Sequence, residues 1–410
     1  MHQKEYLALI LAGGKGKRLS ALTDYMAKPA VYFGGNYRII DFALSNCLHS
    51  GIDSIGVLTQ HHAEDLHRYI DSIGLTQTSE GMSLYMRPPD RQDCEYCGTA
   101  DAVYQNTAFI DRFDPETVLI LAGDHIYKMD YRKLLSFHRS VGADITIASK
   151  YVPWPDTARF GILTTDESGR VRRFAEKPAA AESNLASMGI YACKWETLRR
   201  FLTLDRADRD SWHDFGRDII PRMLRSGAAM YSYHFDGYWQ DVGTVSSLWQ
   251  SNMDLLRGVP DFDLWGDDWK IHTAGSSARP SYTRGGCFLN ESIISGGCSI
   301  AGRVERSVLS DGVIVEEGAE VLDSVVMAQV YIGKNAKIHR AIVGPGVCIM
   351  DGVHVGTVGQ NPDGMRDWME KITLVAPWAK LSRPAERDAG DPAAVGAARL
   401  VKEDMAGASR

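Results

Sequence analysis

The sequence predicts an α/β protein in two parts: a Rossmann-like, mostly parallel sheet, followed by a left-handed parallel β-helix. Two observations carry this prediction. In the first part, short apolar runs that end at glycines or acids alternate with segments of helical periodicity, which is the pattern of βαβ units. In the second part, triplets of β-branched residues recur at a fixed spacing between glycine-rich corners, which is the pattern of stacked hexapeptide coils.

The first part is read element by element from its apolar periodicity. Strands are expected at 6–12, 54–59, 117–122 and 144–150, and helices at 39–50, 62–73 and 129–140. Gly51 stands where a helix C-terminal cap is expected. The runs 160–165 and 171–175 are separated by Asp166-Glu-Ser-Gly-Arg170 and predict an added β-hairpin.

The second part contains a repeat of 17 residues. Ser307, Ser324 and Ala341 each open a β-branched triplet at this spacing, and two further apolar series share the period: Val315, Ile332 and Ile349, and Val321, Ile338 and Val355. Partners six residues apart within each coil indicate a face of six residues repeated three times per turn. An ordinary β-sandwich with regular strands is the alternative.

These changes of pattern predict the domain limits. The sheet domain is expected at 1–255, a linker rich in Gly, Pro, Asp and Ser at 256–286, and the β-helix at 287–378. The tail at 379–410 is dominated by Ala, Gly, Asp and Arg. We expect it to hold a short helix or to be disordered.

Composition excludes several classes of function. A net charge of −7 over 410 residues and a pI near 6.0 argue against a nucleic-acid partner. No apolar run reaches about 18 residues, so no membrane partner is expected. The chain starts with a polar segment without a signal-peptide pattern, which favours a cytoplasmic location.

The seven cysteines do not form a disulfide pattern. Cys94 and Cys97 make a single Cys-x-x-Cys, whereas a zinc site usually needs a second pair at a suitable distance. Zinc or redox chemistry at this pair is the alternative, and reduced thiols are the expectation.

A glycine-rich loop follows the first strand. Leu11-Ala12-Gly13-Gly14-Lys15-Gly16-Lys17-Arg18-Leu19 combines glycines, whose backbone can approach an anion closely, with three cations. A Walker loop is excluded because no Ser or Thr follows Lys17, and the dinucleotide fingerprint would need Gly in place of Leu19. The spacing predicts a phosphate-binding loop, with a plain strand-to-helix turn as the alternative.

Four other side chains are candidates for the same chemistry. Asp124 follows a buried strand at its carboxyl end, where ligands of parallel sheets gather, and is a candidate Mg²⁺ ligand. Asp241 is a second candidate acid, and Lys28 a second cation for phosphates. Lys177, beside Glu176, could neutralise a sugar phosphate. Read one at a time, each has an ordinary alternative: a helix N-cap for either aspartate, a solvated lysine for Lys28, and a surface ion pair for Glu176 and Lys177.

Together these segments closely resemble the bacterial ADP-glucose pyrophosphorylase family, over about residues 5–375. The resemblance lies in the loop 11–19, Lys28-Pro-Ala, 38–46, 98–103, 121–127, 174–178, 186–191, 213–216 and 239–244. The Gly-Gly-x-Gly-x-Arg-Leu loop is shared by sugar-nucleotide pyrophosphorylases, whereas 38–46, 121–127 and 187–191 mark the ADP-glucose branch.

The resemblance implies an activity and residue roles. It implies Mg²⁺-dependent, in-line transfer from ATP to glucose 1-phosphate, which gives ADP-glucose for α-1,4-glucan (glycogen) synthesis. It also implies a homotetramer. The residues implied to bind ATP are Leu11, Ala12, Gly13, Gly14, Gly98, Thr99, Ala100 and Asp101. Those for glucose 1-phosphate are Tyr96, Gly161, Glu176, Lys177 and Ser187. Arg18, Lys28 and Asp124 are implied to be catalytic, with Asp124 and Asp241 as metal ligands.

Two departures from the family pattern concern regulation. Tyr25-Met26 stands where well-known members carry Lys-Arg, and Glu95-Tyr96-Cys97 where they carry Trp-Tyr-Arg. Activation by fructose 1,6-bisphosphate is therefore not expected, and the small-molecule effector is left unidentified.

Three alternative functions stay open at this point. The first is transfer to a sugar 1-phosphate from another nucleotide. The second is a non-catalytic regulatory subunit of the same fold, although Arg18, Asp124 and Lys177 are present. The third is acyl transfer by the β-helix, for which His339 and His354 are the candidates.

Overall fold

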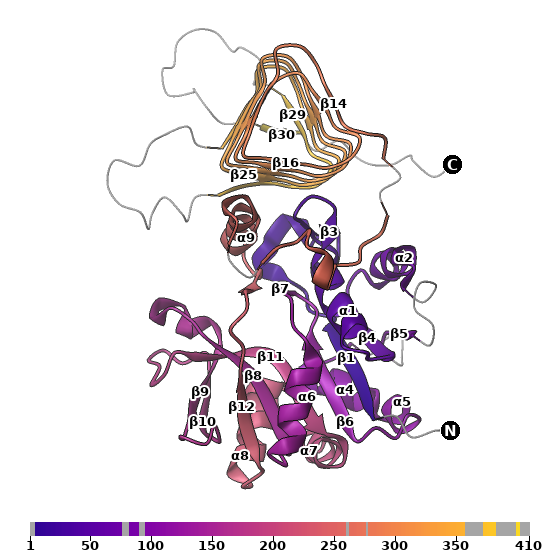
Figure 1. Ribbon diagram of the computed structural model, residues 1–410, viewed down its shortest axis with the longest axis vertical. Coiled ribbons are helices and arrows are strands. Elements are labelled where there is room, and N and C mark those ends of the chain that lie inside the picture. The colour runs from indigo at the N-terminus through magenta and orange to yellow at the C-terminus, as the bar shows by residue number, and fades with distance from the viewer. Residues whose placement is uncertain are drawn as a thin grey trace. The chain divides into compact units, whose positions relative to one another are not determined.

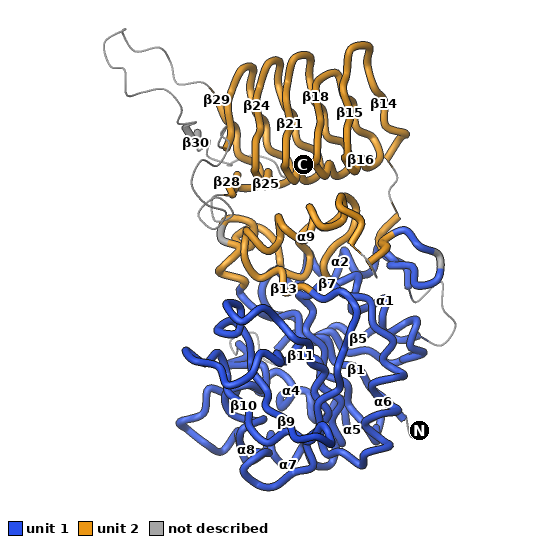
Figure 2. The backbone as a smooth tube through the Cα atoms, turned by 60° about the vertical axis from the view of Figure 1, so that its left-hand side comes forward, with its two compact units in different colours: residues 1–15, 40–239, 265–272 blue, residues 16–39, 240–264, 273–410 orange. Residues whose placement is uncertain are grey.

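The structure is a computed structural model that describes residues 5–75, 82–89, 95–259, 262–275, 278–356, 372–382 and 399–401. It divides into two compact units, shown in Figure 2. Unit 1 comprises 1–15, 40–239 and 265–272, and unit 2 comprises 16–39, 240–264 and 273–410. The linear limits at 255, 286 and 378 stay a prediction, and Cys94 and most of the tail lie outside the described residues.

Unit 1 is built on a twisted sheet whose centre is parallel (Figure 1). Strand β1 (Tyr6–Ala12) lies between β4 (Ser54–Thr59) and β6 (Thr117–Ala122), and β5 (Ser83–Arg87) extends the sheet beyond β4. The pairing of Leu11 with both Leu58 and Ala122 brings the carboxyl ends of three strands to one edge. This confirms the predicted parallel sheet.

The other side of the sheet is mostly antiparallel. Strand β11 (Leu185–Lys194) runs against β6 and β8 (Ile145–Tyr151), and β12 (Met230–His234) pairs in parallel with β8. The predicted hairpin is confirmed as β9 (Gly161–Thr165) and β10 (Val171–Glu176). Two short strands, β7 (His125–Tyr127) and β13 (Trp239–Asp241), carry candidate site residues.

Helices cover both faces of this sheet. Consecutive residues of β1 and β6 are buried, so side chains that point to either face are covered. Leu7, Leu9, Val118 and Ile120 share one hydrophobic cluster with residues of the helices α4, α5, α7 and α8. On the other face, α6 packs on β8, β11 and β12. The helices are α1 (Ile39–His49), α2 (Ala63–Ile73), α4 (Thr99–Gln105), α5 (Thr107–Asp111), α6 (Tyr131–Ser140), α7 (Trp195–Arg206) and α8 (Ile220–Arg225).

The predicted helix limits hold within one or two residues. Helix α1 ends at His49, and Gly51 takes the left-handed φ of +71° that its place after the helix requires. Helix α6 begins at Tyr131, two residues later than predicted. The reason is that the Asp130 side chain accepts the Arg132 N–H at 3.0 Å and so caps the helix.

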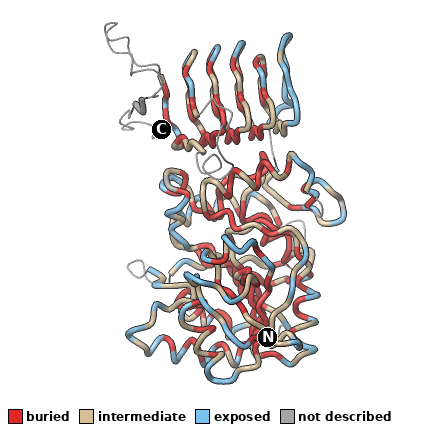
Figure 3. The backbone as a smooth tube through the Cα atoms, turned by 90° about the vertical axis from the view of Figure 1, so that its left-hand side faces the viewer, coloured by how far each residue is buried: buried red, intermediate tan, exposed pale blue. Residues whose placement is uncertain are grey.

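Unit 2 contains the left-handed parallel β-helix, and its 17-residue register is confirmed. Val308 pairs with Val325 and Val325 with Ile342, while Val315, Ile332 and Ile349 stack on a second face. Figure 1 looks at the coil nearly end-on, and Figure 3 shows buried residues along its successive turns. The described coil strands are β14–β17 (282–283, 288–290, 293–294, 299–300), β18–β22 (303–305, 308–309, 314–315, 320–322, 325–326) and β23–β29 (331–332, 337–339, 341–343, 348–349, 354–356, 373–375, 380–382).

A helix of unit 2 is joined to the coils by one tryptophan. Helix α9 (Val245–Arg257) is capped by Thr244, whose hydroxyl accepts the Ser247 N–H. The Trp249 indole N–H donates to the Asp323 carbonyl at 2.7 Å, and the Arg340 guanidinium lies 4.7 Å from the ring centroid. The chain just after Asp241 is therefore packed on a corner of the β-helix.

Among the residues that the structure describes, no helix is both long enough and apolar enough to cross a membrane.

Candidate active site

The phosphate-loop residues of unit 1 leave β1 at the carboxyl edge of the parallel strands. Leu11 and Ala12 are the last residues of β1, and Gly13 and Gly14 follow. A Cβ built on Gly13 would lie 3.3 Å from the Gln60 Cβ and 3.7 Å from the Tyr96 ring, whereas Gly14 has no neighbour within 4 Å. The backbone at Gly14 is therefore open to an approaching ligand, and Gly13 lies against Tyr96.

Tyr96 is held in place by three hydrogen bonds. Its N–H donates to Gln60 Oε1 at 3.0 Å, its hydroxyl donates to the Arg87 carbonyl at 2.9 Å, and it accepts from the Asn106 amide at 3.1 Å. Its hydroxyl is thus engaged by protein groups, and its ring packs against the hydrophobic core of the sheet. Gln60 directly follows β4 and was not predicted as a site residue.

Glu95, one of the two departures from the family pattern, pairs with the phosphate loop. Lys15 Nζ lies 3.2 Å from Glu95 Oε2, with 54% and 63% of the two side chains exposed. His61 is close enough to this pair for Lys15 to contribute, after burial, to lowering the pKa of its imidazole. The other departure, Tyr25, is half exposed in unit 2, and Cys97 is a free, exposed thiol.

The segment 98–101, predicted to bind ATP, is fixed by the loop 211–216. A side chain at Gly98 would collide with the Trp212 and His213 carbonyls, and the Ala100 N–H donates to the His213 carbonyl at 2.8 Å. The Thr99 hydroxyl donates to Asp214 Oδ2 at 2.9 Å and accepts the Phe215 N–H at 3.0 Å. The start of α4 is thereby locked to this loop.

Asp101 has a structural environment. Its carboxylate is buried and accepts hydrogen bonds from the Cys97 N–H at 2.9 Å and the Gln105 amide at 2.8 Å, with Arg206 at 3.4 Å. These bonds satisfy a buried charge. Any contact of Asp101 with ATP is therefore expected through its backbone, and the carboxylate shapes the turn that carries Tyr96.

The predicted glucose 1-phosphate residues Gly161, Glu176 and Lys177 are brought together by the hairpin. Glu176 pairs with Gly161 across β10 and β9, and a Cβ on Gly161 would lie 2.9 Å from Glu176 Oε2. Lys177 Nζ lies 2.8 Å from Glu176 Oε1 and is half exposed. Lys177 has a φ of +47°, which is unusual for a residue with a side chain. Its N–H donates to the Phe160 carbonyl, which holds this conformation.

Ser187 lies on β11 beside a register shift. Its hydroxyl is buried, 3.4 Å from the Tyr191 hydroxyl and 3.3 Å from the Gly189 N–H, which it accepts. Burial raises the pKa of Tyr191, whose ring stacks on Phe215 at 5.4 Å. Through Phe215, Ser187 is linked to the same loop that holds Thr99.

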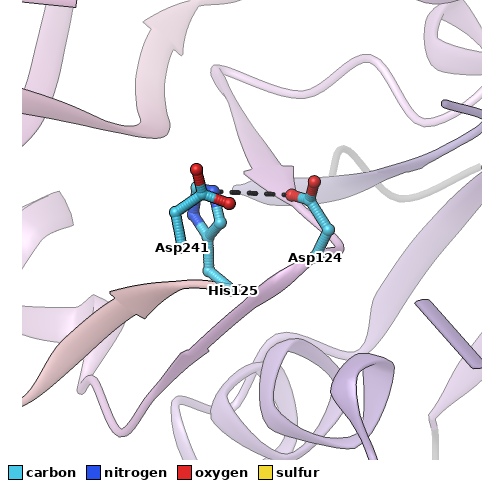
Figure 4. Close-up of side chains that lie close together, drawn as sticks. All are labelled: Asp124, His125 and Asp241. Carbon is cyan, nitrogen blue, oxygen red and sulfur yellow. Dashed lines mark ion pairs between the residues drawn. The ribbon is translucent and has the colours of Figure 1, made fainter. Parts of the chain in front are cut away.

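Asp124 follows β6, as predicted, and a histidine orients it. Trp239 Nε1–H, which can only donate, lies 3.3 Å from His125 Nδ1. Nδ1 is then the acceptor, so the neutral imidazole carries its proton on Nε2, which lies 3.5 Å from Asp124 Oδ1. Figure 4 marks this pair with a dashed line. His125 therefore lies beside Asp124, where an outer partner of a metal ligand would lie.

Asp241 is buried beside the two predicted cations. Lys28 Nζ lies 3.6 Å and Arg18 Nη2 3.8 Å from its carboxylate, and only 7% of the Asp241 side chain is exposed. Lys28 is equally buried, whereas Arg18 is half exposed. A Cβ on Gly243 would lie 2.8 Å from Asp241 Oδ1 and 3.2 Å from Arg18 Cζ. Glycine at this position therefore leaves Arg18 room to reach the acid.

Asp124, His125 and Asp241 each offer one ligand atom, and these atoms all lie within 4.8 Å of one another (Figure 4). Within the described ranges, no other group of His, Cys, Asp and Glu side chains meets this criterion. Carboxylate oxygens are the ligands that Mg²⁺ prefers. Because the His125 Nε2–H is turned toward Asp124, the two carboxylates fit a hard cation better than all three groups do.

Four residues that contribute to the site were not singled out from the sequence. His125 and Gln60 follow strand ends just as Asp124 does, so the argument used for Asp124 could have found them. Asp214 and Gly216 fall within a run that matched the family, but no isolated chemical pattern marks them.

Comparison with known proteins fits this architecture. Residues 7–258 match the nucleotidyl transferase family, and residues 280–369 match the GlmU-like, C-terminal hexapeptide family. The part of the chain that contains the sheet therefore belongs to the nucleotidyl transferase family, and the β-helix is of the hexapeptide type.

Relatives that resemble most of the chain define the family more narrowly. Three are named glucose-1-phosphate adenylyltransferase. The protein of Acetivibrio thermocellus is 46% identical over 88% of this chain and 85% of its own length. Those of Bacillus cytotoxicus and Bacillus anthracis are 48% identical, over 84% and 86% of this chain and 93% and 95% of their own. The chain belongs to the glucose-1-phosphate adenylyltransferase family.

Proposed function

We propose that this protein transfers the adenylyl group of ATP to glucose 1-phosphate and releases ADP-glucose and pyrophosphate. The observation that carries the proposal is the buried acid Asp241 beside Arg18 and Lys28, in a chain of this family that also carries Asp124 at a strand end. Paired acids with flanking cations are the arrangement that phosphoryl and nucleotidyl transfer requires.

The reaction needs alignment and charge neutralisation more than proton transfer. A phosphate oxygen of glucose 1-phosphate attacks the α-phosphorus of ATP, and the bond from the α-phosphorus to the bridging oxygen of pyrophosphate breaks. The nucleophile is already ionised at neutral pH, so no general base is needed. Arg18 and Lys28 would bind the departing pyrophosphate and stabilise its charge.

The metal would be held by Asp124 and Asp241, with His125 orienting Asp124. Bound Mg²⁺ supplies Lewis-acid polarisation of phosphate oxygens. The Asp241 carboxylate lies beside two cations, and the Asp124 carboxylate lies 3.5 Å from His125 Nε2. Both acids present oxygen atoms, which are the ligands that Mg²⁺ prefers.

The two substrates would bind to separate sets of residues, each of which contacts the loop 211–216. ATP would lie over residues 11–14 and 98–101, where Gly14 leaves the backbone open. Glucose 1-phosphate would lie by the Tyr96 ring, Gly161 and Ser187, with Glu176 accepting from sugar hydroxyls and Lys177 neutralising the phosphate.

Pyrophosphate release with ATP, glucose 1-phosphate and Mg²⁺ tests the proposal in wild type, Asp124→Asn, Asp241→Asn and the control Asp236→Asn, whose side chain is 91% exposed. Each site variant is expected to lose about 10²-fold or more in turnover, and the control to behave as wild type. Pyrophosphate release only with another nucleoside triphosphate would mean that this nucleotide, and not ATP, is the substrate. Wild-type silence with every nucleotide would favour a regulatory subunit.

The cellular setting is part of the same proposal. We infer a cytoplasmic homotetramer that supplies ADP-glucose for α-1,4-glucan synthesis and responds to a small-molecule effector. Support for self-association comes from the first coil of the β-helix, where Tyr282, Phe288 and Leu289 are exposed. Light scattering of the purified protein would measure the mass, and a monomer at micromolar concentration would contradict the tetramer.

A further inference from the structure

We propose that a cavity between the hairpin β9–β10 and helix α8 binds a small anion with an apolar portion, and that this ligand changes the affinity for glucose 1-phosphate. We call it the hairpin cavity. It is lined by β9, β10, the segment 178–182 and α8. The site is separate from the residues assigned to catalysis, and its regulatory effect rests on the proposed function.

The hairpin cavity has the size and floor of a small-molecule site. It is partly open to solvent and has a volume of about 350 Å³, within the range of ligand pockets. Ile162, Phe174 and Leu224 form an apolar floor, and Pro178 and Pro221 stiffen its ends. Helix α8 packs directly on β10, and Figure 1 shows the two side by side at the end of the unit. An apolar group would be desolvated there.

The rim of the cavity carries positive charge. Arg172, Arg173 and Arg225 line it against one acid, Glu182. The Arg173–Glu182 pair is 2.7 Å long, but 70% and 63% of these side chains are exposed, so the pair is weak and exchangeable. No carboxylate of the described residues forms an ion pair with Arg225, while Arg172 pairs with Asp166 at 2.6 Å. A carboxylate or phosphate could therefore displace Glu182 and bind two guanidinium groups.

Two elements that line the cavity, β10 and α8, are connected to the residues proposed to bind glucose 1-phosphate. Phe174 lines the cavity, and its ring lies against Gly161. Glu176 follows two residues later on β10. Helix α8 continues from the turn η4 (Phe215–Ile219), whose Gly216 lies against the Glu176 carboxylate. A change in the separation of β10 and α8 would therefore disturb the contact between Gly216 and Glu176.

A ligand in the cavity must act through this separation. If it binds more tightly to one spacing of β10 and α8, it shifts the population toward that spacing and changes the KM for glucose 1-phosphate. The residues assigned to ATP lie on β1 and α4, which do not line the cavity. Thr99, however, is hydrogen-bonded to Phe215 of η4, so a change in the KM for ATP is expected as well.

Phenyl phosphate is a suitable probe, because it joins an apolar ring to a dianion. Calorimetry is done on the full chain without substrates, for wild type, the double variant Arg173→Gln/Arg225→Gln, the cavity-filling Ala180→Trp, and the control Arg200→Gln on exposed α7. We expect wild type and the control to bind with a Kd of about 1 mM or below. Both cavity variants should bind at least tenfold more weakly.

Kinetics then test the coupling. With phenyl phosphate, the KM for glucose 1-phosphate of wild type should change at least twofold, and that of the two cavity variants should not. Binding that persists in the cavity variants but is lost in Lys177→Gln would place the probe at the substrate site and overturn the proposal, as would no binding up to about 10 mM. Binding without any change in KM would overturn the regulatory role. Calorimetry needs no activity, so failure here is distinguishable from failure of the proposed reaction.

Discussion

Gly216 lies against the carboxylate of Glu176, so that a Cβ added to Gly216 would stand 2.8 Å from Glu176 Cδ. The contact joins the loop that holds Thr99 to the strand that carries the proposed sugar ligands. Glu176 cannot keep its place if Gly216 gains a methyl group, because the backbone on both sides is hydrogen-bonded.

Gly216→Ala is therefore expected to raise the KM for glucose 1-phosphate about tenfold or more, since a displacement of about 1 Å is costly at an active site. Gly285→Ala is the control, because Gly285 has no neighbour within 4 Å and no left-handed φ. Steady-state kinetics with varied glucose 1-phosphate measure the effect. An unchanged KM in Gly216→Ala would mean that Glu176 does not contact the sugar.

His125 is expected to control the metal rather than to bind it. His125→Phe removes the Nε2–H that faces Asp124, and we expect the apparent affinity for Mg²⁺ to fall about 10- to 100-fold. Trp239→Phe keeps the imidazole but removes the indole N–H that selects its tautomer, and should give a smaller loss. Titration of turnover with Mg²⁺ measures both. Equal Mg²⁺ dependence in His125→Phe and wild type would contradict the positioning role.

Glu95 is expected to compete with ATP for Lys15. Removing the charge in Glu95→Gln frees the lysine, and the KM for ATP should fall by up to about fivefold, the limit for an exposed pair. The change should disappear at about 0.5 M salt, where the charges are screened. Glu64→Gln, on the exposed side of α2, is the control. A higher KM for ATP in Glu95→Gln would show that Glu95 aids binding.

The β-helix and the strand ends were predictable because they depend on local periodicity. The 17-residue spacing alone sets the register of Val308, Val325 and Ile342. Asp124 was found in the same way, because a buried strand that ends in an acid is visible in the sequence.

Contacts between distant segments were not predictable. Glu176 and Gly216 meet only because α8 packs on β10, and the tautomer of His125 depends on Trp239, which lies 114 residues away in sequence. The same limit explains Asp101. Its residue type and motif suggested a ligand contact, whereas its carboxylate is buried among Cys97, Gln105 and Arg206.

Stability in acid should depend on one buried histidine. His138 on α6 is 5% exposed, its Nδ1 lies 2.8 Å from Thr146 Oγ1, and burial lowers its pKa to about 4. Because the imidazole titrates near 6.5 in the unfolded chain, the unfolded state binds more protons between these values. This contribution to stability is present above about pH 6.5 and is lost as the pH falls toward 4, by about 2 kcal/mol at pH 5.

His138→Gln keeps a polar group near Thr146 but cannot be protonated. Urea unfolding at pH 7 and pH 5 should therefore show a smaller loss of unfolding free energy for His138→Gln than for wild type, by about 2 kcal/mol. His234→Gln is the control, because that imidazole is 42% exposed and should leave the difference between the two pH values unchanged. The same loss in His138→Gln and wild type would show that other groups govern acid unfolding.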